Sequence, residues 1–218
     1  MVVLTLAHHI DLVWMEEAYR RTRKDGAVGV DGVTAEAYEE RLHENLSDLL
    51  ERFKSGRYRA PPVRRVHLPK EGAKNRTRQD CLDCSYGFRP GRSAHQALEA
   101  LWKGLMNIGG GWVIDLDIRA FFDSMDRTHL NAFLDQRVRD GVIRRTLGKW
   151  MQAGAMEDGA ISYPERGSPQ GGVISPLVSN VYLHEVLDQW FEREVKPRLR
   201  GRAFMVRFAD DGWLAFER

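Results

Sequence analysis

The sequence predicts an α+β fold in which amphipathic helices accompany a few short strands. Residues 204–216 hold two apolar runs separated by Asp210, Asp211 and Gly212, the pattern of a β-hairpin with an Asp-Gly turn signal at its tip. Residues 112–118 alternate in the manner of a strand. Apolar residues at helical spacing recur in several other segments, so helices and strands share the chain.

The N-terminal part is predicted to be helical. One helix is expected around residues 14–23, before the glycine-rich stretch 26–32. Thr34 is placed to cap a second helix that runs to Ser55-Gly56. After Pro61-Pro62, residues 63–70 alternate apolar and basic side chains up to a proline, which predicts a strand with cations on one face.

Three later segments are also predicted to be helical. Ser93 and Gln96 form a capping box that opens a helix ending at the glycines 109–111. Residues 126–156 have one long amphipathic pattern. Ser175-Pro176 marks a helix start after the glycine-rich loop 166–172, a type of loop that can offer backbone N–H groups to a phosphate but is usually only a connector.

The strand at residues 112–118 carries acids on one face. Ile114 and Leu116 point to one side, and Asp115 and Asp117 point to the other. Two interpretations stay open at this point: a solvated outer face, or part of a functional site.

The hairpin also carries two neighbouring acids, Asp210 and Asp211. Adjacent carboxylates repel each other, and solvent, a shared proton or a bound cation relieves that repulsion. Mg²⁺ takes one or two carboxylates and keeps other positions for phosphate oxygens. Ordinary turn chemistry explains the same residues, so a metal site needs support from other stretches.

Charge is unevenly distributed along the 218 residues. The formal net charge is only +2, yet residues 52–78 contain ten Lys or Arg and a single acid, Glu71. The remainder is therefore net acidic. A concentrated basic segment is the footprint expected of phosphate binding, with a solvated basic face as the alternative.

The chain shows no sign of export. The apolar run at residues 1–7 is too short to cross a bilayer and has no basic flank. Cys81 and Cys84 form a single Cys-x-x-Cys spacing, which without a second ligand pair favours two reduced thiols over a zinc site. We therefore expect a cytoplasmic protein with no membrane partner.

Considered together, these stretches are similar to the motifs of bacterial group II intron-encoded reverse transcriptases and maturases. The motifs are, in chain order, Gly29-Val30-Asp31-Gly32-Val33-Thr34, Ser55-Gly56-Arg57-Tyr58, Pro69-Lys70 with the basic residues after it, the run 86–95 (YGFRPGRSAH), Asp117-Ile118-Arg119-Ala120-Phe121-Phe122-Asp123, the run 168–177 (SPQGGVISPL), and Phe208-Ala209-Asp210-Asp211. The resemblance extends over nearly everything from about Ala18 onward.

The resemblance implies a right-hand polymerase architecture. Residues 1–92 would form incomplete fingers, residues 93–218 would form a palm whose antiparallel sheet packs on helices, and no thumb is expected within the chain. The implied activity is RNA-directed DNA synthesis by two-metal nucleotidyl transfer, with Mg²⁺ as the cofactor and Mn²⁺ as a substitute. The implied partners are an RNA template, a DNA primer and deoxynucleotide triphosphates, with intron RNA as a further candidate.

The resemblance also implies roles for particular residues. Asp117, Asp210 and Asp211 would be catalytic and would bind the metal ions, together with the carbonyl of Ile118. Phe122 would stand where a ribose 2′ hydroxyl projects, with a core aromatic as the alternative. The remaining implied substrate-binding residues are Gln170, against the incoming nucleotide, and Lys70, Lys74 and Arg76, on its triphosphate.

The sequence departs from the family pattern in three places. The usual spacing after Lys70 is disturbed, and a strand and helix of the fingers are expected to be missing between Arg78 and Asp80. Phe208 stands where the family usually has Tyr, and Gly212 where it usually has a bulky apolar residue. These departures keep a second hypothesis open, a catalytically silent RNA-binding remnant; a metal-dependent nuclease is a weaker third because no His or extra carboxylate is arranged to activate water.

Overall fold

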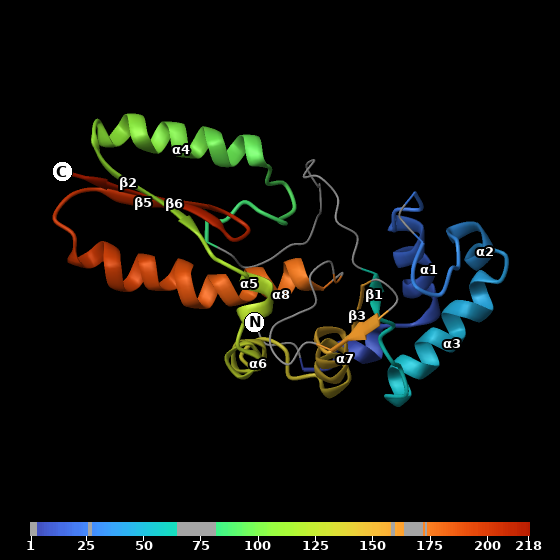
Figure 1. Cartoon of the computed structure of the whole chain (residues 1–218). Helices are drawn as coiled ribbons and strands as arrows, with labels where there is room; N and C mark the ends of the chain where they lie inside the picture. Colours follow the sequence, from blue (N-terminus) through green and yellow to red (C-terminus); the bar gives the residue numbers. More distant parts are fainter. Residues whose placement is uncertain (1–3, 26–27, 65–81, 158–159, 164–171, 173) are drawn as a thin grey trace. The chain divides into compact units, whose positions relative to one another are not determined.

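A computed structural model describes residues 4–25, 28–64, 82–157, 160–163, 172 and 174–218 (Figure 1). The chain forms two compact units, each assembled from two stretches of sequence. The first unit comprises Met1–His67 and Leu134–Ile174, and the second comprises Leu68–Phe133 and Ser175–Arg218. Helices and two small sheets are both present in the described residues, which confirms the α+β prediction.

The first unit is mainly helical. Its helices are η1 (Leu6–His9), α1 (Leu12–Arg21), α2 (Ala35–Glu39), α3 (Leu42–Ser55) and α7 (Gly141–Met151). Thr34 caps α2, as predicted, by accepting a hydrogen bond from the Ala37 N–H at 3.2 Å. The prediction of one continuous helix from Thr34 to Ser55 is wrong, because Arg41 leaves the helical conformation (φ −126°, ψ 39°). The side chain of Asn45 then donates to the Tyr38 carbonyl at 2.9 Å, which stabilises the break.

The first unit also holds a small sheet in the order β1-β3-β4. Its strands are β1 (Val63–Arg64), β3 (Ala155–Glu157) and β4 (Ala160–Ser162). β1 pairs with β3 in parallel, and β3 pairs with β4 in antiparallel orientation. The strand predicted at residues 63–70 therefore begins as expected, and its continuation lies outside the described residues.

The single helix predicted at residues 126–156 is wrong. The segment contains α6 (Arg127–Asp135), α7 and β3 in succession. The break comes at Asp140, whose carboxylate accepts hydrogen bonds from the N–H groups of Val142 and Ile143 at 2.9 and 3.1 Å. An Asp that satisfies the first N–H groups of a helix starts a new helix there.

The second unit is built on a three-stranded antiparallel sheet in the order β2-β6-β5. The strands are β2 (Gly111–Asp117), β5 (Ala203–Phe208) and β6 (Asp211–Glu217). Helix α4 (Ala94–Ile108) lies on one face of this sheet and the helix that begins with α8 (Ser175–Leu183) lies on the other (Figure 1). Ser93 caps α4 by accepting from the Gln96 N–H, as the capping box predicted.

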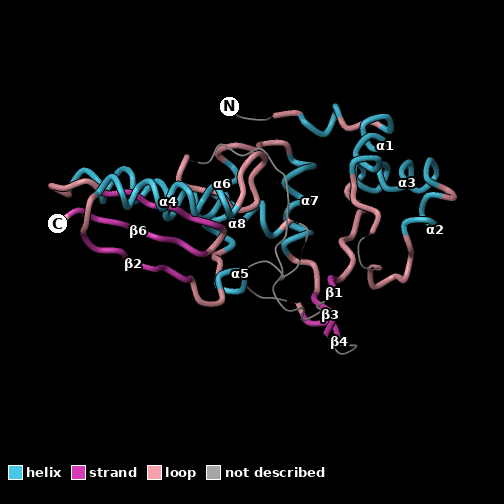
Figure 2. Tube along the Cα trace, turned by 90° about the horizontal axis from the view of Figure 1, so that it is seen from above, coloured by secondary structure: helices cyan, strands magenta, loops and turns pink. Residues whose placement is uncertain are grey.

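Each face of this sheet has its own apolar core. Val206, Phe204 and Trp213 pack with Ala97 on the α4 face, and Met205 and Leu214 pack with Phe191 on the opposite face. Helix α4 packs mainly on β5 and β6, and β2 lies at an outer edge of the sheet (Figure 2). The edge strand that carries two predicted acids is therefore open to solvent.

The helix on the second face changes its winding along its length. After α8 come two π-helical segments, η2 (His184–Asp188) and η3 (Phe191–Val195), and a final 3₁₀ turn, η4 (Lys196–Arg198). The short helix α5 (Phe121–Ser124) follows β2. None of the helices in the described part of the chain is long and apolar enough to cross a membrane.

Candidate active site

The tip of the β5–β6 hairpin is a two-residue loop made of Ala209 and Asp210. β5 ends at Phe208 and β6 begins at Asp211, and these two residues are register partners. Ala209 has φ +58°, in the left-handed region that non-glycine residues rarely occupy. The predicted Asp-Gly turn is therefore displaced: Gly212 is a buried strand residue paired with Arg207, and the bend lies at Ala209 and Asp210.

Asp117 and Asp211 face each other across the sheet. Asp117 ends β2, and its register partner on β6 is Asp211. Directly opposite residues of an antiparallel pair have Cα atoms about 4.5–5.5 Å apart, and their side chains point to the same face. Both carboxylates are exposed, and Asp210, one residue away, is half-buried. The three predicted catalytic acids thus gather at one end of the sheet.

Asp115 shares the face of Asp117 but lies two residues earlier in the strand. Its register partner is Trp213, so no second acid stands opposite it. Ile118 follows the end of β2 and is half-buried. The predicted alternation, with Asp115 and Asp117 on the face opposite Leu116, agrees with the strand register and with the packing of Leu116 against the Phe191 core.

The donor set at this end of the sheet suits a hard divalent cation, since carboxylate oxygens are the ligands that Mg²⁺ prefers. Among the residues that the structure describes, no group of three or more His, Cys, Asp or Glu is closed tightly enough to hold a metal ion by itself. Mg²⁺ is usually bound by one or two carboxylates plus substrate phosphates, so an open pair of acids is compatible with such a site.

Two aromatic residues follow the strand at α5. Phe121 is 4% exposed and packs edge-on against Phe122 and Tyr182, with ring centroids 5.4 and 6.3 Å apart. Phe122 is only partly buried. The expectation that Phe121 is the core residue therefore agrees with the structure, and Phe122 has an accessible surface. The predicted substrate residues Lys70, Lys74, Arg76 and Gln170 all lie outside the described residues.

Comparison with known proteins identifies the family. The profile of the family "Reverse transcriptase (RNA-dependent DNA polymerase)" matches residues 73–218, about two thirds of the chain. The chain belongs to the reverse transcriptase family. One of its curated relatives is named a group II intron-encoded protein, which supports the resemblance that the motifs indicated.

Two curated relatives cover most of this reverse transcriptase-family chain. Protein YkfC of Escherichia coli is 32% identical over 216 residues, which are 86% of this chain and 57% of YkfC. The group II intron-encoded protein LtrA of Lactococcus lactis is 27% identical over 213 residues, which are 84% of this chain and 35% of LtrA. The chain thus spans between about a third and just over half of the length of these relatives. Among solved structures, a partial Cas6-RT-Cas1–Cas2 complex aligns with 95% of this chain and 37% of its own at a TM-score of 0.47 and 16% identity.

One feature near the acids of this reverse transcriptase-family protein was not predicted from the sequence. Arg207 lies in the middle of the apolar strand β5 and is completely buried, and its guanidinium forms a paired contact with buried Asp188. A charged residue inside an apolar strand run is a signal that could have been used, because a buried charge requires a partner. The sequence gives no indication of which of the many acids is that partner.

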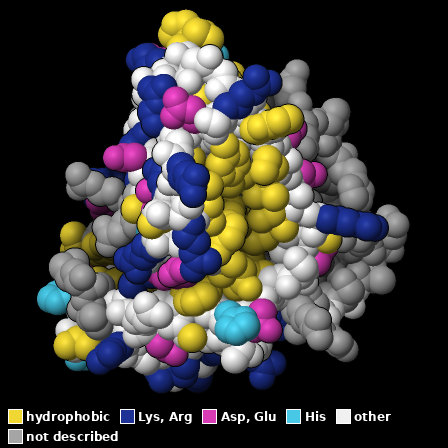
Figure 3. All heavy atoms as spheres, turned by 90° about the vertical axis from the view of Figure 1, so that its left-hand side faces the viewer, with side chains coloured by type: hydrophobic (Ala, Val, Ile, Leu, Met, Phe, Trp, Pro, Cys, Tyr) yellow, Lys and Arg dark blue, Asp and Glu magenta, His cyan; other side chains and the backbone are white. Residues whose placement is uncertain are grey.

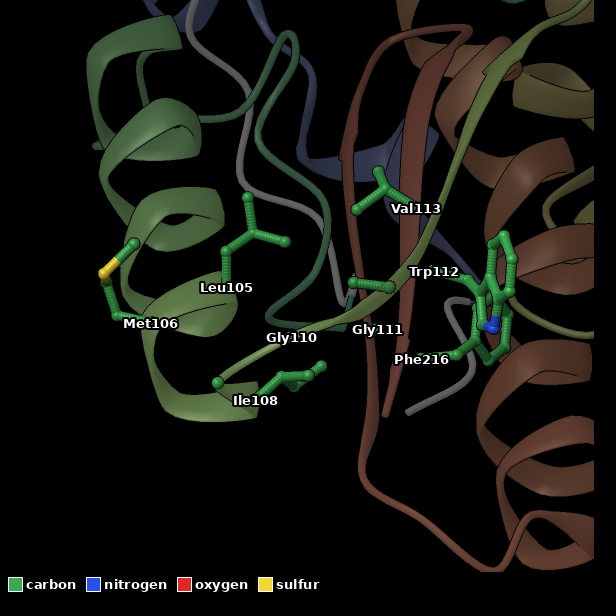
Figure 4. Close-up of a pocket in the computed structure, with 10 residues that line it drawn as sticks. Leu105, Met106, Ile108, Gly110, Gly111, Trp112, Val113 and Phe216 are labelled. Atoms are coloured by element: carbon green, nitrogen blue, oxygen red, sulfur yellow. The ribbon is translucent and has the colours of Figure 1, made fainter. Parts of the chain in front are cut away.

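An apolar pocket of about 450 Å³ lies at the far end of the same strands, about 20 Å from Asp117 along β2 at 3.3 Å per residue. Its lining has no titratable side chain and includes Leu105, Ile108, Val113 and Phe216. Hydrophobic side chains gather around a hollow on this side of the molecule (Figure 3). In the close-up, Trp112 and Phe216 lie side by side, and Leu105 points from α4 toward the strands (Figure 4). Because its lining has no charged side chain, the pocket is unsuited to a nucleotide triphosphate.

Proposed function

We propose that this chain carries the catalytic centre of an RNA-directed DNA polymerase, located where Asp117, Asp210 and Asp211 meet. The observation that carries the proposal is the register of the sheet, which pairs Asp117 with Asp211 and sets Asp210 beside them in the loop. These acids come from strands about ninety residues apart in the sequence. In this proposal, residues 93–218 act as the palm and residues 1–92 as the fingers.

The acids would hold Mg²⁺, with Mn²⁺ as a substitute. Asp117 and Asp210 would provide carboxylate ligands, Asp211 would lie beside them, and the carbonyl of Ile118 would add one oxygen. When bound, two such ions activate the primer 3′ hydroxyl and stabilise the charge on the leaving pyrophosphate. The chain itself positions the reacting groups and provides negative charge in a fixed arrangement.

The substrates in this proposal are deoxynucleotide triphosphates, a DNA primer and an RNA template. Phe122 would exclude a ribose 2′ hydroxyl, which is consistent with its partly exposed ring next to β2. Gln170 would contact the incoming nucleotide, and the basic residues Lys70, Lys74 and Arg76 would bind its triphosphate. The name of the relative LtrA makes intron RNA a further candidate partner. We also propose a cytoplasmic location.

A second candidate function is a catalytically silent RNA-binding protein of the same family. The departures from the family pattern after Lys70 and at Phe208 and Gly212 favour considering it. Such a protein would keep the basic segment 52–78 for RNA binding and would not catalyse DNA synthesis.

Primer extension on an RNA template, with and without Mg²⁺, tests the polymerase proposal. The unmodified chain is expected to extend the primer only with the cation, and Asp210→Asn is expected to abolish extension. Asp115→Asn is the matched control, since it removes an acid from the same strand face that has no acid opposite. Extension that survives Asp210→Asn, or that fails at every Mg²⁺ concentration in the unmodified chain, would overturn the proposal.

A further inference from the structure

We propose that Arg207 is a positioning residue, which fixes the loop that carries Asp210 by donating a hydrogen bond to the backbone of Ala209. The Nη1 of Arg207 donates a hydrogen bond to the Ala209 carbonyl at 2.7 Å. Ala209 is buried and holds a left-handed conformation (φ +58°) without being a glycine. A conformation of that kind persists only when surrounding contacts enforce it. Arg207 makes such a contact with Ala209, the residue immediately before Asp210.

The guanidinium itself is held in a single orientation. It donates to both oxygens of Asp188, from Nε and Nη2 at 2.8 Å each. It also donates from Nη1 to the Asn180 side-chain oxygen at 3.1 Å and from Nη2 to the Ser85 hydroxyl at 2.9 Å. Together with the bond to Ala209, these contacts use all five N–H groups of the side chain. A Lys, with a compact ammonium and three donors, has no equivalent of this planar fork.

The partners of Arg207 are themselves deeply buried and come from separate elements. Asn180, Asp188, Ser85 and Arg207 are each 0% exposed, and they belong to α8, to η2, to the segment before α4 and to β5. The cluster therefore connects the helix on one face of the sheet with the hairpin strand. It rigidly links the loop at Ala209 to the core of the second unit.

The segment at residues 84–87 supports the same loop from another side. Cys84 and Tyr86 bond to the backbone of Arg207, which donates its N–H to the Cys84 carbonyl at 2.7 Å and accepts from the Tyr86 N–H at 2.8 Å. Gly87 follows directly, and a Cβ added to it would lie 2.2 Å from the Ala209 nitrogen. Its carbonyl accepts a bond from the Asn180 amide at 2.8 Å. The backbone of Ala209 is thus enclosed between Gly87 and the guanidinium.

Stability alone is a weak explanation for this cluster. A buried ion pair loses solvation, and an apolar pair of similar volume is often at least as stable. Placement is a better explanation, because metal-binding carboxylates must be held in a narrow range of positions by residues whose own orientations are fixed. This inference rests on the proposed function for the role of Asp210, but the hydrogen bond from Arg207 to Ala209 can be tested independently of that function.

The test replaces the ion pair by apolar side chains in the double variant Arg207→Met with Asp188→Leu. This change removes the bond to Ala209 without leaving an unpaired buried charge. Backbone amide hydrogen exchange is measured at residues 209–211 and in the middle of β6. Exchange at residues 209–211 is expected to accelerate at least tenfold while the centre of β6 stays unchanged. In primer extension, kcat is expected to fall at least tenfold with KM for the template-primer unchanged.

Two further variants keep the test decisive. Arg207→Lys retains a charge beside Asp188 and loses the fork, so it replaces the double variant if that one does not fold. Arg202→Met is the matched control, because Arg202 is an exposed arginine on the same hairpin that pairs with Glu217 instead. It should leave exchange at residues 209–211 unchanged.

The exchange measurement separates this inference from the proposed function. Unchanged amide exchange at residues 209–211 in a folded variant that lacks the hydrogen bond to Ala209 overturns the positioning role of Arg207. Faster exchange there in a chain that never extends a primer supports the positioning role and overturns the polymerase proposal for this polypeptide.

Discussion

Asp117 on β2 is the register partner of Asp211 on β6, which sets two carboxylates directly opposite each other at the open end of the sheet. Like charges in that arrangement destabilise an antiparallel pair, although exposure to solvent weakens the repulsion. Repulsion of this kind would be a local cost to the sheet. A cation between the acids would remove that cost, and this links the register to the proposed metal site.

Removing one of the two charges should therefore stabilise the metal-free protein. Asp211→Asn or Asp117→Asn is expected to raise the free energy of unfolding by about 0.2–1 kcal/mol in EDTA, because the opposed charges are lost. In Mg²⁺ the unmodified chain should gain stability by ligand binding, and these variants should gain less. Urea unfolding under both conditions measures the difference. An identical Mg²⁺ effect in Asp117→Asn and in the control Asp115→Asn would contradict this prediction.

The strands could be predicted from the sequence because residues 112–118 alternate and the hairpin segments are apolar runs of strand length, although β2 itself is exposed at every position except the half-buried Leu116. The position of the turn could not, since local propensity favours Asp211-Gly212, whereas Ala209 at the observed turn lies against Gly87 and accepts a hydrogen bond from Arg207, whose guanidinium is held by residues outside the hairpin. Helix breaks were missed for a similar reason. The apolar pattern continues across Asp140, and only the capping contacts show that a new helix starts there.

The predicted triad acids are brought to one end of a sheet, which periodicity alone could not establish because their proximity depends on strand order and register. The register of β2 and β6, which pairs Asp117 with Asp211, establishes this proximity. The roles of these acids remain predictions, as do those of Phe122 and of the substrate residues outside the described part.

Gly87→Ala should impair catalysis beyond its effect on stability. The added Cβ would clash with the Ala209 backbone, 2.2 Å from its nitrogen, at a cost of about 1–3 kcal/mol as an overpacked contact. Gly91→Ala is a matched control in the same loop, because it meets no atom within 4 Å and costs about 1–2 kcal/mol through its positive φ of +71°. Thermal unfolding and primer extension are measured for both variants. Equal loss of extension at equal loss of stability would show that Gly87 has no special relation to the site.

Phe122→Ala should change the choice between sugars. Removing a ring that collides with a 2′ hydroxyl is expected to raise ribonucleotide incorporation relative to deoxynucleotide incorporation. Phe121→Ala serves as the control, since that ring is buried and its loss should cost about 3–5 kcal/mol and lower both rates alike. The ratio of the two incorporation rates is the measurement, and a ratio that Phe122→Ala leaves unchanged assigns Phe122 to the core.

The pair of Arg207 and Asp188 should make the second unit sensitive to acid. Burial by itself raises the pKa of Asp188, but the nearby His184 imidazole, 3.8 Å away, and the hydrogen-bonded Arg207 guanidinium outweigh it and hold the pKa below its ordinary value. A carboxyl with a lowered pKa in the folded state contributes stability above its unfolded pKa of about 3.9, and that contribution is lost as the pH falls through the folded value. Unfolding by urea at about pH 6 and about pH 3 should thus show a smaller loss in the Arg207→Met, Asp188→Leu variant than in the unmodified chain. Equal losses in both would contradict the assignment of this acid sensitivity to Asp188.

RNA affinity and catalysis should depend on different residues, and this separates the two candidate functions. Binding should depend on the basic segment 52–78 and weaken steeply with salt, because each phosphate neutralised by Lys or Arg releases counterions, with a log–log slope of about −0.7 per contact for single strands. Replacing Arg64 and Arg65 by Gln is expected to lower the affinity and flatten that slope.

Asp210→Asn should leave the RNA affinity nearly unchanged or slightly improved while it abolishes extension, because it removes a negative charge and a metal ligand. Fluorescence anisotropy with labelled RNA across a salt series measures the first effect, and primer extension measures the second. A chain that binds RNA with this slope and extends no primer at any Mg²⁺ concentration is the silent RNA-binding protein, whereas a chain whose affinity is indifferent to salt uses its basic segment for something other than phosphate contacts.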